Sequence, residues 1–223
     1  MVPTSPDLPP NLPRRDEEAR ARLRAVAAQA RPFVAAGDRR LAVTGELGSL
    51  LPAGGLQRGS TVAVAGPPGS GATTVAMTLA AAATAAGEWA AVVDPTGTLG
   101  ARAAGAAGVE LERLAVVRCM PPDRWAAVVA ALLDGITVVV AAVPPHLRLG
   151  DARRLVARAR ERRAVLVAFG AWPVEAAVRV HTGRCTWNGL GAGTGLLDAR
   201  ELHIEVEGKG RPREKVRGFA RAG

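Results

Sequence analysis

The chain has 223 residues, which is enough for one α/β domain with a full core but too few for two ordinary domains with linkers. Its 29 Lys and Arg against 20 Asp and Glu give a net charge of +9, which favours a polyanion or an acidic protein as partner. Two cysteines and three dispersed histidines provide neither metal-binding spacing nor a disulfide framework, so we expect no metal site and no cofactor. The sequence has no apolar run of membrane length and no secretory segment after Met1, which predicts a cytoplasmic protein without membrane contact.

The first two segments of the chain differ in composition. Residues 1–14 contain five prolines, which block regular helix and predict an extended lead. Residues 15–38 show helical periodicity, and Leu23 and Val26 lie on the apolar face of the predicted helix. This face could dock on the chain's own domain or on another protein, and the sequence leaves both open.

Residues 66–74 read Gly-Pro-Pro-Gly-Ser-Gly-Ala-Thr-Thr, between a strand predicted at 61–65 and an Ala-rich helix predicted at 73–86. This arrangement is typical of a phosphate-binding loop, in which glycines bring backbone N–H groups to the phosphates and a lysine neutralises their charge. Ala72 occupies the position of that lysine. The residues left for nucleotide binding are Gly66, Gly69, Gly71, Thr73 and Thr74.

The rest of the chain alternates short apolar runs with helical segments. This pattern predicts a mostly parallel central sheet with helices on both faces. After Pro173, shorter strands and Gly-rich turns predict an antiparallel C-terminal edge. We expect a core at 39–207 followed by a basic tail at 208–223. The predicted strands are 89–93, 114–117, 136–142 and 164–169, and the predicted helices lie near 98–106, 123–133 and 150–162.

The groups that a nucleotide hydrolase needs besides the lysine are also missing. The strand at 136–142 ends in Ala141 and Ala142, where a carboxylate for Mg²⁺ would stand. The strand at 164–169 ends at Gly170, which offers no polar side chain to position water. Asp94 is the one acidic residue near the expected site, and an aspartate followed by proline is often a turn former. We therefore expect no enzymatic activity.

Three motifs in order resemble the entry to the RecA ATPase core. They are Thr-Gly-x-Leu at 44–47, Gly-Gly-Leu-x-x-Gly at 54–59 and the loop at 66–74. The resemblance implies a RecA-like fold in which the family's catalytic glutamate falls at Thr96 and its phosphate-sensing glutamine at Gly170. It also puts Lys209 near the lysine that reaches a neighbour's nucleotide, and it implies a homo-oligomer formed through the N-terminal helix.

A RecA-like chain this short, without a C-terminal domain or long DNA-binding loops, is most similar to the ImuA/ImuA′ group. Those proteins are accessory factors of the bacterial damage-inducible mutasome, which belongs to the SOS response. The resemblance implies partnership with an ImuB-like polymerase-related protein and an error-prone DnaE-type polymerase. It therefore implies a catalytically inert accessory protein in mutagenic translesion DNA synthesis.

Two basic segments are candidates for binding a partner or nucleic acid. Arg154, Arg158 and Arg162 share one face of the helix predicted at 150–162, where they could contact DNA phosphates without sequence specificity or simply face solvent. The C-terminal segment carries further candidates for binding an acidic or grooved partner. These are Lys215, Arg217 and Phe219.

Two alternative functions remain at this stage. The first is a nucleotide-binding RecA-like ATPase in which Lys209 or another cation replaces the missing lysine. The second is a cell-division inhibitor resembling the SulA group, a RecA-like class that also lacks ATPase residues. Retention of the glycine loop and of the N-terminal helix argues against the second.

Overall fold

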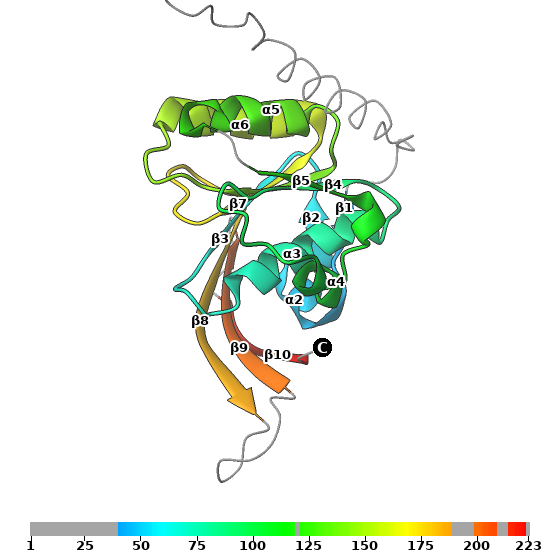
Figure 1. Cartoon of the computed structure of the whole chain (residues 1–223). Helices are drawn as coiled ribbons and strands as arrows, with labels where there is room; N and C mark the ends of the chain where they lie inside the picture. Colours follow the sequence, from blue (N-terminus) through cyan, green and yellow to red (C-terminus); the bar gives the residue numbers. More distant parts are fainter. Residues whose placement is uncertain (1–39, 119–120, 189–198, 209–213, 222–223) are drawn as a thin grey trace, which may run out of the picture.

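The computed structural model describes residues 40–118, 121–188, 199–208 and 214–221. Within these ranges the chain forms a large twisted sheet with helices on both faces (Figure 1). The predicted lead at 1–14, the N-terminal helix with Leu23 and Val26, and Lys209 lie outside the described residues. Over the part of the chain that is described, no helix is both long and apolar enough to span a bilayer.

The main sheet has eight strands among the described residues. Six of them run parallel to their neighbours, and the last two add to one edge in the antiparallel sense. In spatial order the strands are β10 (Glu214–Arg221), β9 (Ala199–Gly208), β8 (Val178–Asn188), β3 (Thr61–Ala65), β7 (Val165–Phe169), β6 (Val138–Ala142), β4 (Ala90–Val93) and β5 (Leu114–Val117). The predicted α/β class, with a mostly parallel sheet and an antiparallel edge, is confirmed.

The structure corrects two details at the C-terminal end. The antiparallel part begins one strand later than the sequence predicts, because β8 runs parallel to β3, with Val62 opposite Val178. Val180 is fully buried, so β8 continues the core of the sheet. The segment predicted as a basic tail at 208–223 contains β10, which pairs with β9 and has Val216 opposite Ile204. The pairing with β9, rather than a local sequence pattern, makes this segment a strand.

Helices cover both faces of the sheet. On one face lie α5 (Trp125–Leu133) and α6 (Leu149–Arg162), and on the other lie α2, α3 and α4 (Figure 1). A separate antiparallel pair, β1 with β2, precedes β3. The remaining elements are β1 (Arg40–Ala42), α2 (Gly45–Leu50), β2 (Gly55–Gln57), α3 (Ala72–Thr84) and α4 (Ala101–Ala106), with 3₁₀ turns at Pro52–Gly54, Leu111–Arg113 and Pro122–Arg124.

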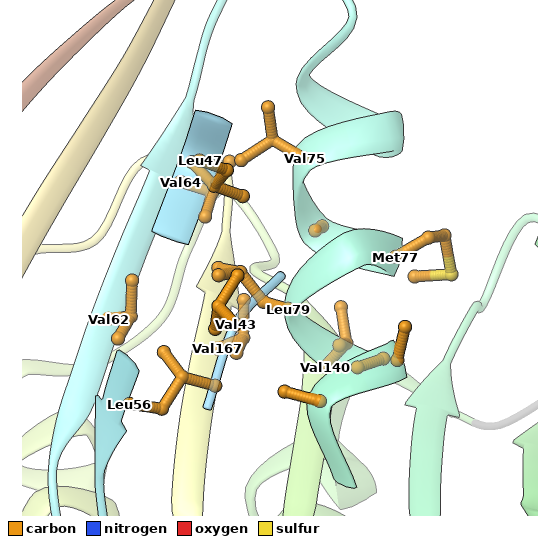
Figure 2. Close-up of a cluster of buried hydrophobic side chains, with 14 of the residues drawn as sticks. Val43, Leu47, Leu56, Val62, Val64, Val75, Met77, Leu79, Val140 and Val167 are labelled. Atoms are coloured by element: carbon orange, nitrogen blue, oxygen red, sulfur yellow. The ribbon is translucent and has the colours of Figure 1, made fainter. Parts of the chain in front are cut away.

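The two faces of the sheet hold two apolar clusters. Alternate strand residues point to opposite faces, so Val140 packs beneath α3 while its neighbour Val139 packs beneath α5 and α6. Figure 2 shows the α3 side, where Leu79 lies beside Val167 and Val64 lies beside Val75. The side chains of Leu79, Val64 and Val167 are fully buried. Burying side chains of this size contributes about 1.5–3 kcal/mol each. Alanine has the highest helix propensity and little bulk, so the Ala-rich α3 can lie close to the strands.

A partly buried ion pair closes the amino-terminal end of the parallel strands. The Arg58 guanidinium donates to both carboxylate oxygens of Glu88, at 3.0 and 2.5 Å, and the Thr137 hydroxyl donates to Glu88 Oε2 at 2.5 Å. Burial raises the pKa of Glu88, but the hydrogen bonds and charge of Arg58 together with the Thr137 bond outweigh it and lower the pKa. The ion pair therefore links the turn before β3 to the starts of β4 and β6.

Replacement of the Glu88 carboxylate should destabilise the fold strongly. Glu88→Gln removes the carboxylate charge to which Arg58 and Thr137 donate, and we expect a loss of about 1–3 kcal/mol in the free energy of unfolding. Urea unfolding at neutral pH measures this loss. The control is Glu112→Gln, an exposed carboxylate, which should change stability by less than about 0.5 kcal/mol. Equal stabilities of the two variants would contradict the role of the ion pair.

Candidate functional site

The glycine loop connects β3 to α3 as the sequence predicts. Gly69 and Gly71 have φ angles of 80° and 84°, in the left-handed region that L side chains rarely adopt. Gly71 forms the N-cap of α3, and the Ser70 N–H donates to the Pro67 carbonyl at 3.1 Å. The strand, loop and helix therefore have the connectivity of a phosphate-binding loop.

The loop is packed tightly against β8 and β9. The buried hydroxyls of Ser70 and Thr182 are hydrogen-bonded at 2.6 Å. A Cβ atom on Gly66 would lie 1.9 Å from the Thr182 hydroxyl, and one on Gly71 would lie 2.5 Å from the Leu202 side chain. Packing therefore requires glycine at position 66, where the Thr182 backbone carbonyl also lies within 2.7 Å, whereas a side chain at position 71 would force Leu202 to shift.

The structure adds a cation that the sequence analysis does not single out. The Arg200 guanidinium on β9 donates to the hydroxyl of Thr74 in the first turn of α3, and it also lies 5.6 Å from the centre of the Trp187 ring. Arg200 and Thr74 are 126 residues apart in sequence. No local pattern could reveal this contact, because it depends on how β9 pairs with β8.

The position of the missing lysine is part of the core. Ala72 is only 6% exposed and belongs to the apolar cluster between α3 and the sheet. Next to it, Thr73 is exposed at the start of the helix. A lysine at position 72 would therefore have to extend its charge away from this apolar surround.

A pocket of about 280 Å³ lies beside the loop, at the carboxyl ends of the strands. It brings together the expected catalytic positions, because Thr96 and Ala142 both line it, and Phe169, the neighbour of Gly170, lines it too. The complete lining is Thr73, Ala76, Met77, Val92, Val93, Asp94, Thr96, Thr98, Leu99, Val140, Ala142 and Phe169. Two of the positions expected from the sequence, Thr96 and Ala142, therefore lie in one place in the molecule.

Asp94 forms a turn, in agreement with one of the two roles that the sequence leaves open. Its Oδ1 accepts bonds from the Thr96 hydroxyl at 2.9 Å and the Gly97 N–H at 3.0 Å, and its Oδ2 accepts from the Leu99 N–H at 2.8 Å. Burial raises the pKa of Asp94, but these bonds, with that from Leu99 the strongest, outweigh it and lower the pKa. The carboxylate is therefore ionised and engaged within its own turn.

The arginines on α6 lie on the opposite face of the sheet from the loop and are bound by carboxylates. Arg154 contacts Asp151 at 2.5 Å. Arg158 donates to both oxygens of Asp134, at 2.7 and 2.5 Å, and Arg162 reaches the same carboxylate at 3.1 Å. Part of the positive charge predicted for this face is therefore compensated within the protein.

The C-terminal candidates belong to the edge strand rather than to a tail. Lys215, Arg217 and Phe219 stand opposite Glu205, His203 and Glu201 of β9 in the strand register. The three positions are alternate ones along β10. Neither these residues nor the α6 arginines lie in the loop or in the pocket beside it.

Fold and site together define an α/β protein in which a glycine loop joins a buried strand to a helix with the connectivity of a phosphate-binding loop. The model of the MT3502 N-terminal domain family matches residues 49–174, which is more than half of the chain, and the chain belongs to this family. No curated protein matches the sequence. The matched residues include the loop, the Asp94 turn and the whole pocket lining. Strands β8 to β10, with Arg200 and Leu202, follow the match.

Two loop glycines provide a matched test of packing. Gly69 and Gly71 have similar φ angles, but only Gly71 faces a neighbouring side chain. We expect Gly69→Ala to cost about 1 kcal/mol from backbone strain and Gly71→Ala to cost about 2 kcal/mol more from contact with Leu202. Adding Leu202→Ala to Gly71→Ala should recover part of this extra cost in urea unfolding. Equal effects of the two alanine substitutions would show that Leu202 does not restrict the loop.

Replacement of Asp94 should change the pH dependence of stability. Because folding lowers the pKa of Asp94, its contribution is complete above the unfolded pKa of about 3.9 and is lost as the pH falls through the folded pKa. We expect Asp94→Asn to cost about 1–3 kcal/mol at neutral pH and progressively less below about pH 4.

Urea unfolding between about pH 3 and 7 measures this difference. The exposed Asp123→Asn is the control and should stay close to the unmodified protein throughout. A cost of Asp94→Asn that does not vary with pH would contradict the proposed role of the ionised carboxylate.

Proposed function

We propose that this protein is a catalytically inert accessory protein of RecA-like fold that acts by protein–protein interaction in damage-induced translesion DNA synthesis. The proposal that the protein is not a catalyst is supported by the pocket beside the loop. There Thr96 and Ala142 occupy the positions at which the resemblance expects a catalytic and a Mg²⁺-binding carboxylate. The remaining carboxylate, Asp94, is bound within its own turn. The role in DNA repair is supported by the motif resemblance to the RecA core and to the ImuA/ImuA′ group.

A mainly parallel sheet followed by late antiparallel strands agrees with the RecA-like fold that we propose. In this proposal the protein acts by binding other proteins. The loop is fixed by β8 and β9, and the helices cover both faces, so the fold can hold surfaces in constant relation to one another. An ImuB-like protein and a DnaE-type polymerase are the partners we propose, with any DNA contact being nonspecific. Self-association through residues 15–38 is part of the same proposal, as is a cytoplasmic location.

Hydrolysis of ATP should be absent, because phosphoryl transfer depends on charged groups that stabilise the transition state. We expect purified protein to show no turnover above background in a phosphate-release assay. Ala72→Lys alone should not produce activity, because the Mg²⁺ carboxylate is still missing. Turnover that disappears in Gly71→Ala, in a variant shown to be folded, would overturn the proposal.

Arg200 supports nucleotide binding without hydrolysis as a second candidate function. Its guanidinium lies at the first turn of α3, where a phosphate bound by the loop would benefit from positive charge. If the accessory role is correct, millimolar ATP with Mg²⁺ should barely change the melting temperature. A rise of several degrees at micromolar ATP, lost in Arg200→Gln, would favour the second candidate and identify the replacement cation.

The accessory role itself is tested in cells of the source organism. Deletion of the gene should lower the frequency of damage-induced mutation, and a copy carrying Thr73→Val should restore it because the loop performs no chemistry. Co-precipitation with the polymerase-related partner should be unchanged by the same substitution. Normal mutation frequency in the deletion strain, or failure of folded Thr73→Val to restore it, would contradict an inert accessory role.

A further inference from the structure

The pocket beside the loop has walls that suit an uncharged ligand. Most of its lining is apolar, including Met77, Val140 and Phe169. Its volume of about 280 Å³ is close to the lower end of small-molecule sites, which start at about 300 Å³. Helix α3 and strands β4 and β6 supply much of the wall, so the cavity exists before any ligand binds.

The charges around the pocket argue against phosphate as its occupant. None of the described residues that line it is Lys, Arg or His. The single ionised group is Asp94, which is 6% exposed and whose bonds to the turn at Thr96, Gly97 and Leu99 stabilise its negative charge. An anion placed there would be repelled, and a cation would have to compete with the hydrogen bonds that the carboxylate already accepts.

Besides the Asp94 carboxylate, the polar side chains that line the pocket are threonine hydroxyls. Thr96 and Thr98 are hydrogen-bonded to each other at 3.0 Å, and Thr96 also donates to Asp94. Thr73 stands exposed at the end of α3 nearest the loop. Apolar walls with a few hydroxyls recognise a compact molecule that has one neutral hydrogen-bonding group.

We propose that this pocket, in the place where a related ATPase would hold catalytic groups, binds a small neutral molecule with an apolar body and a single hydroxyl. The Thr73 hydroxyl contacts the ligand's polar group, and Met77, Val140 and Phe169 contact its apolar body. This site is separate from the partner surfaces of the proposed function, and it can exist whether or not those partners are correct.

The probes are 4-methylphenol and toluene, which differ by one hydroxyl, titrated into the isotope-labelled full chain and followed by amide chemical shifts. We expect saturable shifts in residues 73–77 and 92–99, with a Kd for 4-methylphenol of about 1 mM or tighter. Ala142→Leu fills the pocket with a larger side chain. It should weaken the binding of both probes at least about tenfold, because the ligand is sterically excluded. Ala127→Leu, the same change on an exposed helix position, should leave binding unchanged.

Thr73→Val provides a second test that needs no change of pocket volume. It should weaken the binding of 4-methylphenol by about 2- to 10-fold and leave the binding of toluene unchanged, because only 4-methylphenol can form a hydrogen bond with the Thr73 hydroxyl. The proposal is overturned if neither probe gives saturable shifts up to about 10 mM, which is well above the expected Kd. It is also overturned if folded Ala142→Leu binds as well as the parent, or if inorganic phosphate moves the same resonances at lower concentration than 4-methylphenol. Equal loss of both probes in Thr73→Val would remove the assigned contact.

Discussion

The packing of the late strands against the glycine loop is the constraint on which the arrangement of this site depends. Gly66 lies against Thr182 of β8, and Gly71 lies against Leu202 of β9. The buried bond between Ser70 and Thr182 adds direction to this contact. Since the loop also starts α3, these contacts fix the helix that forms one wall of the pocket.

The same packing explains the glycines of the loop without any bound nucleotide. In an ATPase the glycines admit phosphate to the backbone, whereas here two of them also admit neighbouring side chains. Ala72 extends this pattern, because its methyl group is part of the apolar core. A motif that resembles a ligand site can therefore be retained by the requirements of folding alone.

Much of the parallel core could be predicted from sequence because its signals are local. Short apolar runs match β3 and β5 as the structure has them, and the loop follows β3 as expected. The place of the pocket can also be predicted from the sequence, because the carboxyl ends of parallel strands meet at one edge of a sheet. The predictions that are wrong concern segments whose structure depends on strand pairing. Residues 214–221 have few local features that separate an edge strand from a basic tail, and their partner is β9.

Side-chain contacts across the sequence account for the rest of what could not be predicted. The pairing of Arg158 and Arg162 with Asp134 joins α6 to the residue that follows α5, and it changes a predicted basic face into a partly neutral one. Arg200 reaches Thr74 only because β9 is in register with β8. Such contacts carry no periodic pattern, so they become visible only once the strands are placed in space.

The bond between Ser70 and Thr182 spans 112 residues of the chain, and this separation has a consequence for synthesis on the ribosome. The loop and α3 leave the ribosome long before β8 and β9 are made. The nascent domain therefore lacks the contacts of Thr182 and Leu202 with the glycine loop until synthesis has passed β9. Contacts of such long range slow folding, because the chain between them must first be closed. The family match ends before β8, so a chain that stops there would keep the loop sequence but lose the side chains that hold the loop in shape.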